Sequence, residues 1–166
     1  MTGFHVRATT EHDWERVRDL RLEMIQDTPL AFGESIETAL THSEDEWRMR
    51  GARGRSDRGI YLVAIDDDTD RWVGTMGGFL DGTVPLLVGV YVSPDRRGPE
   101  HGVAEALIAG VEEWAKHFGP VITLHVHEEN SRARAFYARL GYQPTGRRFP
   151  YVLDRSKIEF ELSKRL

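Results

Sequence analysis

Hydrophobic and polar positions follow two periods along the chain, and the period changes from segment to segment. Alternating or continuous apolar runs predict strands over residues 4–8, 60–65, 72–80, 85–92, 121–126, 148–152 and 158–162. Apolar residues at three- and four-residue steps predict helices over residues 11–25, 102–118 and 130–140. A helix separates the strands at 85–92 and 121–126, so we expect these two strands to be parallel.

Shorter signals complete the pattern. Ser43 before Glu46 is a capping-box arrangement, which predicts a short helix ahead of Trp47. The strands at 60–65 and 72–80 are joined by a short polar turn, as in a hairpin. No repeat or linker interrupts the order of elements. We therefore predict one α/β domain over residues 1–166.

The turn after the strand at 85–92 is rich in Gly and Arg. Arg96 and Arg97 lie just before the helix that begins near Gly102, and the first turn of a helix presents unpaired N–H groups. This arrangement favours an anion, with phosphate the obvious candidate. The turn lacks the three glycines of a dinucleotide fingerprint and the Gly-Lys-Ser/Thr of a P-loop, which excludes both. An ordinary connection with solvated arginines remains an alternative at this point.

Composition narrows the class of protein. The chain has 166 residues, 40% of them hydrophobic, which suits one globular domain, and no apolar run is long enough to span a membrane. The net charge of −5 argues against a nucleic-acid partner, since affinity for phosphate backbones comes from clustered Lys and Arg. Cysteine is absent and no signal peptide is visible, so we expect a cytoplasmic protein without disulfides or thiol chemistry.

A second motif, downstream of the turn, indicates the kind of protein to which the turn belongs. From Leu124 the chain reads LHVHEENSRARAFYARLGY, which resembles the L-x-V-x-x-x-N-x-x-A-x-x-F-Y-x-x-x-G-F/Y segment of the GNAT superfamily of acyl-CoA-dependent N-acyltransferases. Upstream, V-x-V-x-P-x-x-R-G from Val90 and G-V-A-x-A-L from Gly102 resemble the cofactor-binding segment of the same family. The resemblance implies a mixed, mostly antiparallel sheet with two splayed parallel central strands and helices on both faces.

The same resemblance implies that acetyl-CoA is the acyl donor and places its contacts. Backbone groups of the strand would line the pantetheine arm, and the turn, Asn130 and a helix arginine would complete the site. The expected cofactor-binding residues are Val90, Tyr91, Val92, Arg96, Arg97, Gly98, Gly102, Val103, Ala104, Asn130, Arg132 and Tyr137. The turn is two residues longer than the family's R-G-x-G-x-G/A. Within it Pro99 has no N–H to donate and Glu100 repels phosphate.

The reaction needs an acid for the departing thiolate and a base for the amine. By resemblance Tyr137 is the acid, although a buried aromatic residue at helical spacing is the alternative interpretation. The base is not assigned by the sequence, and Glu34, His125 and His127 are the candidates. His125 and His127 share one face of a strand, but a metal site needs further ligands, so we expect no metal.

The resemblance leaves several functions open. We expect acetyl transfer to a primary amine of a small molecule. The alternatives are acetylation of a protein amino terminus or lysine, and a non-catalytic domain that binds acyl-CoA. The residues that would form the acceptor pocket carry no readable motif, so the sequence does not name the amine. By resemblance the chain is a possible homodimer, and we expect no nucleic-acid or membrane partner.

Overall fold

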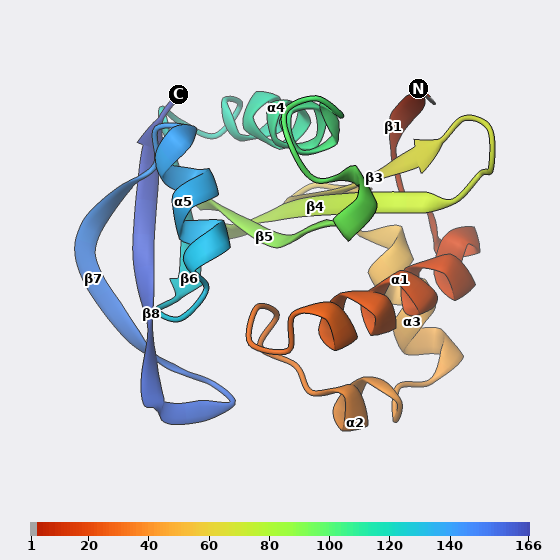
Figure 1. The fold of residues 1–166 in the computed structure, drawn as a ribbon, viewed down its shortest axis with the longest axis horizontal. Helices are drawn as coiled ribbons and strands as arrows, with labels where there is room; N and C mark the ends of the chain where they lie inside the picture. The colour runs from red at the N-terminus through yellow and green to blue at the C-terminus, as the bar shows by residue number, and fades with distance from the viewer. Residues whose placement is uncertain (1–2) are drawn as a thin grey trace.

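The computed structural model describes residues 3–166, in which one sheet runs through the molecule with helices on both of its faces (Figure 1). The strands are β1 (Phe4–Ala8), β2 (Arg55–Ser56), β3 (Gly59–Asp66), β4 (Trp72–Asp81), β5 (Val84–Val92), β6 (Val121–His127), β7 (Gln143–Tyr151) and β8 (Asp154–Arg165). The helices are α1 (Trp14–Asp27), α2 (Ile36–Ala39), α3 (Glu44–Ala52), α4 (Val103–Ala115) and α5 (Ser131–Arg139), with short 3-10 turns at Glu11–Asp13 and Pro94–Arg96.

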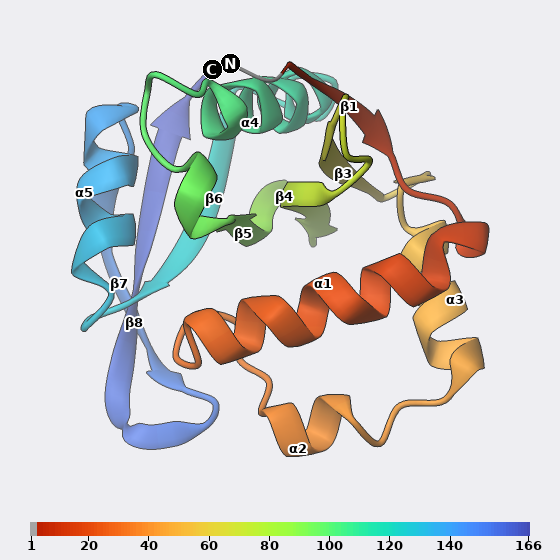
Figure 2. The ribbon, with the colours of Figure 1, turned by 45° about the vertical axis from the view of Figure 1, so that its right-hand side comes forward.

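The sheet has the strand order β1-β3-β4-β5-β6-β8-β7, with β2 paired to β3. Neighbouring strands are antiparallel except β5 and β6, which are parallel as predicted. Helix α4 connects these two strands across one face of the sheet, and α1 to α3 lie on the other face (Figure 2). The expected fold class, mixed and mostly antiparallel with a splayed parallel pair and helices on both faces, is confirmed.

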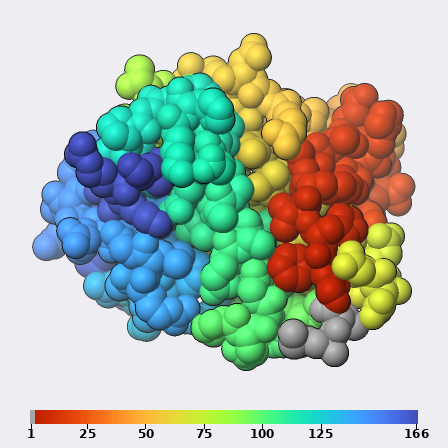
Figure 3. Space-filling view, turned by 90° about the horizontal axis from the view of Figure 1, so that it is seen from above, coloured from red at the N-terminus to blue at the C-terminus, as the bar shows by residue number. Residues whose placement is uncertain are grey.

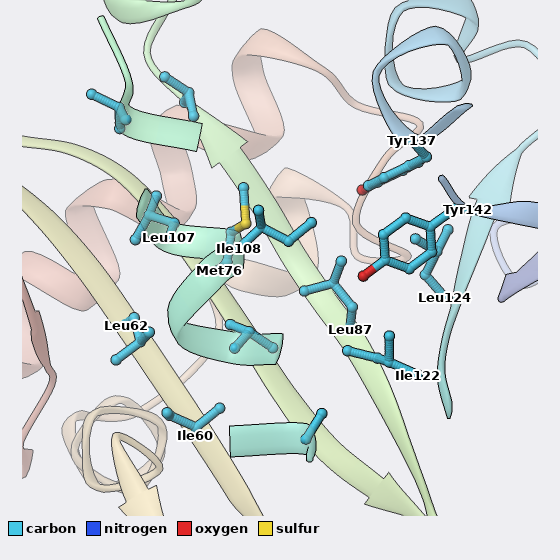
Figure 4. Close-up of a cluster of buried hydrophobic side chains, with 14 of the residues drawn as sticks. Ile60, Leu62, Met76, Leu87, Leu107, Ile108, Ile122, Leu124, Tyr137 and Tyr142 are labelled. Carbon is cyan, nitrogen blue, oxygen red and sulfur yellow. The ribbon is translucent and has the colours of Figure 1, made fainter. Parts of the chain in front are cut away.

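Two apolar clusters hold the helices to the sheet. One lies under α4 and α5 and includes Leu62, Met76 and Leu107, and the other lies under α1 and α3 and includes Val63, Ile65 and Met24. Leu62 and Val63 are neighbours in β3 and enter different clusters because successive side chains of a strand point to opposite faces. Figure 4 shows the first cluster reaching from β3 to the tyrosines that flank β6.

The parallel strands are paired over a very short length. Only Leu86 with Thr123 and Leu87 with Leu124 are in register, and beyond them β5 and β6 diverge. On its other side β5 stays paired with β4, with an irregularity opposite Thr75 to Gly77. Gly89 in this bulge has φ +60°, a left-handed conformation that costs glycine little. The bulge and the divergence together open the centre of the sheet.

Candidate active site

A cleft of about 330 Å³ opens where β5 and β6 diverge. It is lined by backbone and side chains of β5, by the turn after β5, and by β6 and α5. From Val88 onward β5 has no strand opposite it on the β6 side, so its backbone groups there are available to a ligand. Of the residues expected to bind the cofactor, the lining includes Val90, Tyr91, Val92, Arg97, Gly98, Ala104, Asn130, Arg132 and Tyr137.

Tyr137 is carried to the cleft by α5. This helix is capped by Asn130, whose side chain accepts the Ala133 N–H at 3.3 Å and which also forms part of the cleft lining. The Tyr137 side chain is 6% exposed and packs beside Phe136 and Tyr142. Its hydroxyl has no hydrogen-bond partner within residues 3–166 and points toward β5 in Figure 4.

Burial also sets the protonation of Tyr137. Removal from water disfavours the phenolate and raises the pKa of Tyr137 above its ordinary value. The hydroxyl therefore carries its proton throughout the physiological range. A protonated hydroxyl that faces a cleft without a partner is able to donate to a bound group.

The turn between β5 and α4 presents backbone donors to the other end of the cleft. Gly102 caps α4 with φ +71°, and the helix begins at Val103, so its first-turn N–H groups have no helical acceptor. Glu100 folds back over the turn, since an added Cβ at Gly98 would lie 2.5 Å from the Glu100 carboxylate. The turn thus combines a helix amino terminus that favours phosphate with a carboxylate that repels it.

The two turn arginines have different surroundings. Arg96 pairs with Asp66 at the end of β3 and is not part of the cleft lining. Arg97 lines the cleft, donates from Nε to the Val92 carbonyl at 2.8 Å and pairs with Asp27 at 2.6 Å. Of the two, Arg97 alone lies where it could contact a ligand, and Arg96 anchors the turn to the sheet.

A second cavity, of about 540 Å³, lies beside the first and is lined mainly by α1, α3, β3, β4, β5 and the loop at residues 31–33. The two cavities share part of their lining, and the shared residues are Ala31, Phe32, Leu87, Val88, Gly89 and His125. The bulge at Gly89 therefore forms part of the wall common to both. A group in the first cavity can reach a group in the second at this junction.

Glu34 lies beside the second cavity in a network of cations. Its carboxylate accepts hydrogen bonds from Arg50 at 3.0 and 3.1 Å, His42 at 2.6 Å and Arg21 at 2.8 Å. Burial alone would raise the pKa of this carboxyl, but these bonds lower the pKa of Glu34 to about 2. A carboxylate held this way is a poor proton acceptor, and Glu34 does not line either cavity. Its contacts indicate a role in holding the loop before α2.

His125 lines both cavities, and its ring stacks on Phe149 with centroids 4.5 Å apart. His127 is buried, and its Nδ1 accepts the Glu129 N–H at 3.0 Å. Glu159, in β8 opposite His127, lines the second cavity. Burial raises the pKa of Glu159, partly offset by the nearby His125 and His127. Within residues 3–166 no group of three or more His, Asp and Glu is arranged to hold a metal ion.

The sequence reasoning missed Glu159. It lies in a strand that alternates polar and apolar residues, so its carboxylate resembles the solvated groups of any half-exposed strand. Only the register of β8 against β6 reveals the position of Glu159, because it places Glu159 and Glu161 on the face that carries His125 and His127. That register is fixed by tertiary pairing and is not visible from local periodicity.

Solved structures share this arrangement. A PaiA N-acetyltransferase from Thermoplasma acidophilum, solved in complex with coenzyme A, superposes with a TM-score of 0.72 at 17% identity over 99% of both chains. A GNAT-family acetyltransferase from Streptococcus pneumoniae superposes with a TM-score of 0.77 at 16% identity, again over 99% of both chains. The fold is therefore that of the N-acetyltransferases. A comparison with proteins of curated function found no match.

The family follows from the sequence itself. The family model described as acetyltransferase (GNAT) family matches residues 14–142, which include the cleft, the turn and Tyr137. This chain belongs to the GNAT acetyltransferase family, and it is an acetyl-CoA-dependent N-acetyltransferase. The predictions of the family, the enzyme class and the acetyl donor are confirmed. Among the helices of residues 3–166, none has the length and apolar character needed to cross a bilayer.

Proposed function

We propose that this enzyme moves the acetyl group of acetyl-CoA to a primary amine of a small molecule by direct attack of the amine on the thioester. One observation carries the proposal: the cofactor cleft and the second cavity meet at Gly89 and His125, with the Tyr137 hydroxyl in the cleft. An amine in the second cavity and a thioester in the cleft would come together at this junction. Direct attack needs this arrangement of two ligands and no covalent enzyme intermediate.

The donor would lie along β5. The unpaired backbone of β5 beyond Leu87 would bind the pantetheine arm and polarise the acyl carbonyl, and the N–H groups at the start of α4 would receive the pyrophosphate. Arg132 lines the same cleft 3.8 Å from Asp27 and would reach an outer phosphate. We leave Arg96 out of this set because it is paired with the buried Asp66.

The reaction involves two proton transfers, one to the departing thiolate and one from the amine. The amine nitrogen attacks the carbonyl carbon, the carbon–sulfur bond breaks, and Tyr137 donates its proton to the departing thiolate. Burial raises the pKa of Tyr137, so the hydroxyl keeps its proton until the thiolate develops beside it. The proton lost by the amine passes to His125 at the junction and on to Glu159. Glu159 suits this role because burial raises its pKa and so strengthens it as a base.

Acetylation of a protein amino terminus or lysine is the alternative. The second cavity is bounded by the loop around Phe32 and Gly33, by Trp47 of α3 and by the β3–β4 hairpin. Walls on these sides favour a small acceptor over an extended peptide. The non-catalytic alternative does not account for a protonated tyrosine in the cleft.

The test is a product assay. Purified protein is incubated with acetyl-CoA and a panel of small primary amines, peptides with free amino termini and peptides with internal lysine, and acetylated products are identified by mass spectrometry. We expect acetylation of small amines and little of either peptide class. Peptide acetylation without small-amine acetylation overturns the choice of acceptor. Binding of acetyl-CoA with no transfer to any member of the panel overturns the proposed reaction.

A further inference from the structure

The second cavity has a strongly basic wall. Four arginines line it, contributed by α1, α3 and the segment between α3 and β3: Arg21, Arg50, Arg53 and Arg58. Glu159 is the single carboxylate among the lining residues of this cavity in the described part of the chain. Such an excess of cations is unexpected in a protein whose overall net charge is −5. A pocket that binds an amine would ordinarily be neutral or acidic, since a free amine is cationic in water.

Two of the four arginines are neutralised within the protein. Arg21 and Arg50 both bind the Glu34 carboxylate, and Arg50 also binds Glu46 at 3.0 Å. Their side chains are only 19% exposed. These two arginines therefore hold the loop and α3 together, and they contribute little free charge to the pocket.

Arg53 and Arg58 are different. Both are exposed, and neither has a carboxylate partner within residues 3–166. One terminal nitrogen of Arg58 donates to the carbonyl oxygens of Leu80 and Gly82, which fixes the side chain beside the β4–β5 turn. Carbonyl partners position a guanidinium without cancelling its charge. Arg53 and Arg58 line the second cavity but not the cofactor cleft, so they are not placed to bind the phosphates of acetyl-CoA.

The arginines of the basic wall and the residues at the proposed site of reaction lie on different strands. Arg58 directly precedes β3, whereas His125 belongs to β6 and Glu159 to β8. The junction with the cofactor cleft is at Gly89 of β5, two strands from β3 and about four residues further along the sheet than Arg58, a separation of roughly 16 Å. An arginine side chain covers part of that distance. One elongated small molecule can therefore present its amine at the junction and a second group to Arg53 and Arg58.

We propose that the acceptor is an amine that also carries an anionic oxyacid group, a carboxylate or a phosphate, bound by Arg53 and Arg58 at the end of the pocket away from the thioester. This inference rests on the proposed function, since it describes the acceptor of that reaction. Guanidinium groups recognise both anions through charge-assisted hydrogen bonds. The same wall disfavours acceptors with several positive charges, such as polyamines, because like charges repel.

The test compares acceptors that differ only in charge. The probes are glycine, 4-aminobutyrate and 6-aminohexanoate with the amide of each, O-phosphoethanolamine with ethanolamine, and spermidine. For every probe the rate of acetylation is measured, and binding to the protein saturated with coenzyme A is measured by titration calorimetry. We expect at least one anionic probe to be acetylated with kcat/KM about tenfold or more above its uncharged partner, and spermidine to be a poor acceptor. A comparison of the carboxylate probes with O-phosphoethanolamine shows which anion is preferred.

The variants are Arg53→Gln and Arg58→Gln, with Arg55→Gln as the matched control. Arg55 is exposed in the same segment and does not line either cavity. For the preferred anionic probe we expect each variant to raise KM about tenfold with little change in kcat, and to leave the KM of the uncharged partner unchanged. The control should match the unaltered enzyme. Circular dichroism of each variant checks that the fold is retained.

Three results separate the two proposals. Acetylation of amides or spermidine as efficiently as of the anionic probes overturns the anionic acceptor and leaves the proposed function standing. Preferential binding of an anionic probe, lost in Arg53→Gln and Arg58→Gln but with no acetylation, overturns the proposed function and supports the anion site. Absence of both binding and acetylation for every probe overturns the anionic acceptor, and the product assay with the wider panel then decides the proposed function.

Discussion

Glu34 and Glu159 are two carboxylates near the second cavity whose surroundings move their pKa values in opposite directions. Glu34 accepts bonds from three cationic or protonatable side chains, which lower the pKa of its carboxyl, whereas Glu159 is half-buried without such donors and its pKa is raised. The sequence indicated Glu34 as a candidate base and did not indicate Glu159. Local spacing shows that a carboxylate is present, but only the tertiary partners determine whether it can accept a proton.

The Glu34 network makes stability depend on pH. The folded-state pKa of about 2 lies below the ordinary value of 4.5, so the stabilisation is fully present above pH 4.5 and is lost as the pH falls toward 2. We expect Glu34→Gln to reduce the free energy of unfolding by about 2 kcal/mol at pH 7. Urea unfolding at several pH values measures this. A difference between the two proteins that stays constant from pH 7 to pH 2.5 would contradict the assignment.

Glu159 makes activity depend on pH. A base acts only when deprotonated, and because burial raises the pKa of Glu159, kcat/KM should fall on the acid side at a pH above the usual glutamate range. Glu159→Gln should lower kcat by at least about tenfold and remove or shift that acid limb. Glu37→Gln is the comparison, since Glu37 is exposed and lines neither cavity. Unchanged profiles for Glu159→Gln would rule out its role.

At the scale of elements, the predicted strands and helices agree well with those of the structure where the sequence pattern is apolar, and less well elsewhere. The strands at 60–65, 72–80 and 85–92 are buried, and each differs from the structure by at most one residue at either end. Strands β7 and β8 are much longer than the predicted 148–152 and 158–162. Pro144, Gly146 and a mostly exposed surface hide β7 from any hydrophobic pattern. The four-residue helix α2 was not predicted, because one turn has too few residues for a period.

The turn from β5 to α4 is the element whose sequence departs most from its family pattern. Glu100 lies over Gly98, where its charge opposes the phosphate that the start of α4 favours. We expect Glu100→Gln to tighten acetyl-CoA binding severalfold at low ionic strength, and less at high salt because ions screen the repulsion. Titration calorimetry measures the change.

The control for the turn is Glu113→Gln, which removes the same charge further along α4, where Glu113 pairs with Lys116. This variant should bind acetyl-CoA like the unaltered protein. Equal affinities for Glu100→Gln and the unaltered protein at low salt would mean that Glu100 does not oppose the cofactor.

At the scale of the whole molecule, the divergence of β5 from β6 creates the site. Those strands share only two residue pairs, so the sheet is nearly divided into β1 to β5 and β6 to β8, joined through α4 and the apolar cluster beneath it. Figure 3 shows α4 lying between the two parts when the molecule is viewed from above. The first cavity occupies the gap at the strand edges, and the second cavity lies against the amino-terminal part.

Most residues that the sequence predicted to bind the cofactor line the first cavity, whereas the lining of the second cavity was largely not predicted, for a physical reason. The cofactor side depends on short contiguous features, namely a strand, a turn and helix starts, which leave recognisable spacing around Gly102 and Asn130. The acceptor side combines single residues from α1, α3, β3, β6 and β8. No local pattern links Arg58 with Glu159, because their proximity to one cavity arises from the order of the strands.

The central claim is that Tyr137 donates the proton to the departing thiolate, and the most direct measurement is the kinetic comparison of Tyr137→Phe with the unaltered enzyme. Phenylalanine keeps the buried ring and removes only the hydroxyl, which has no partner within residues 3–166. We predict that kcat falls about 100-fold while the Kd for acetyl-CoA changes less than about twofold. A kcat within about twofold of the unaltered enzyme, with the same Kd, would contradict the account.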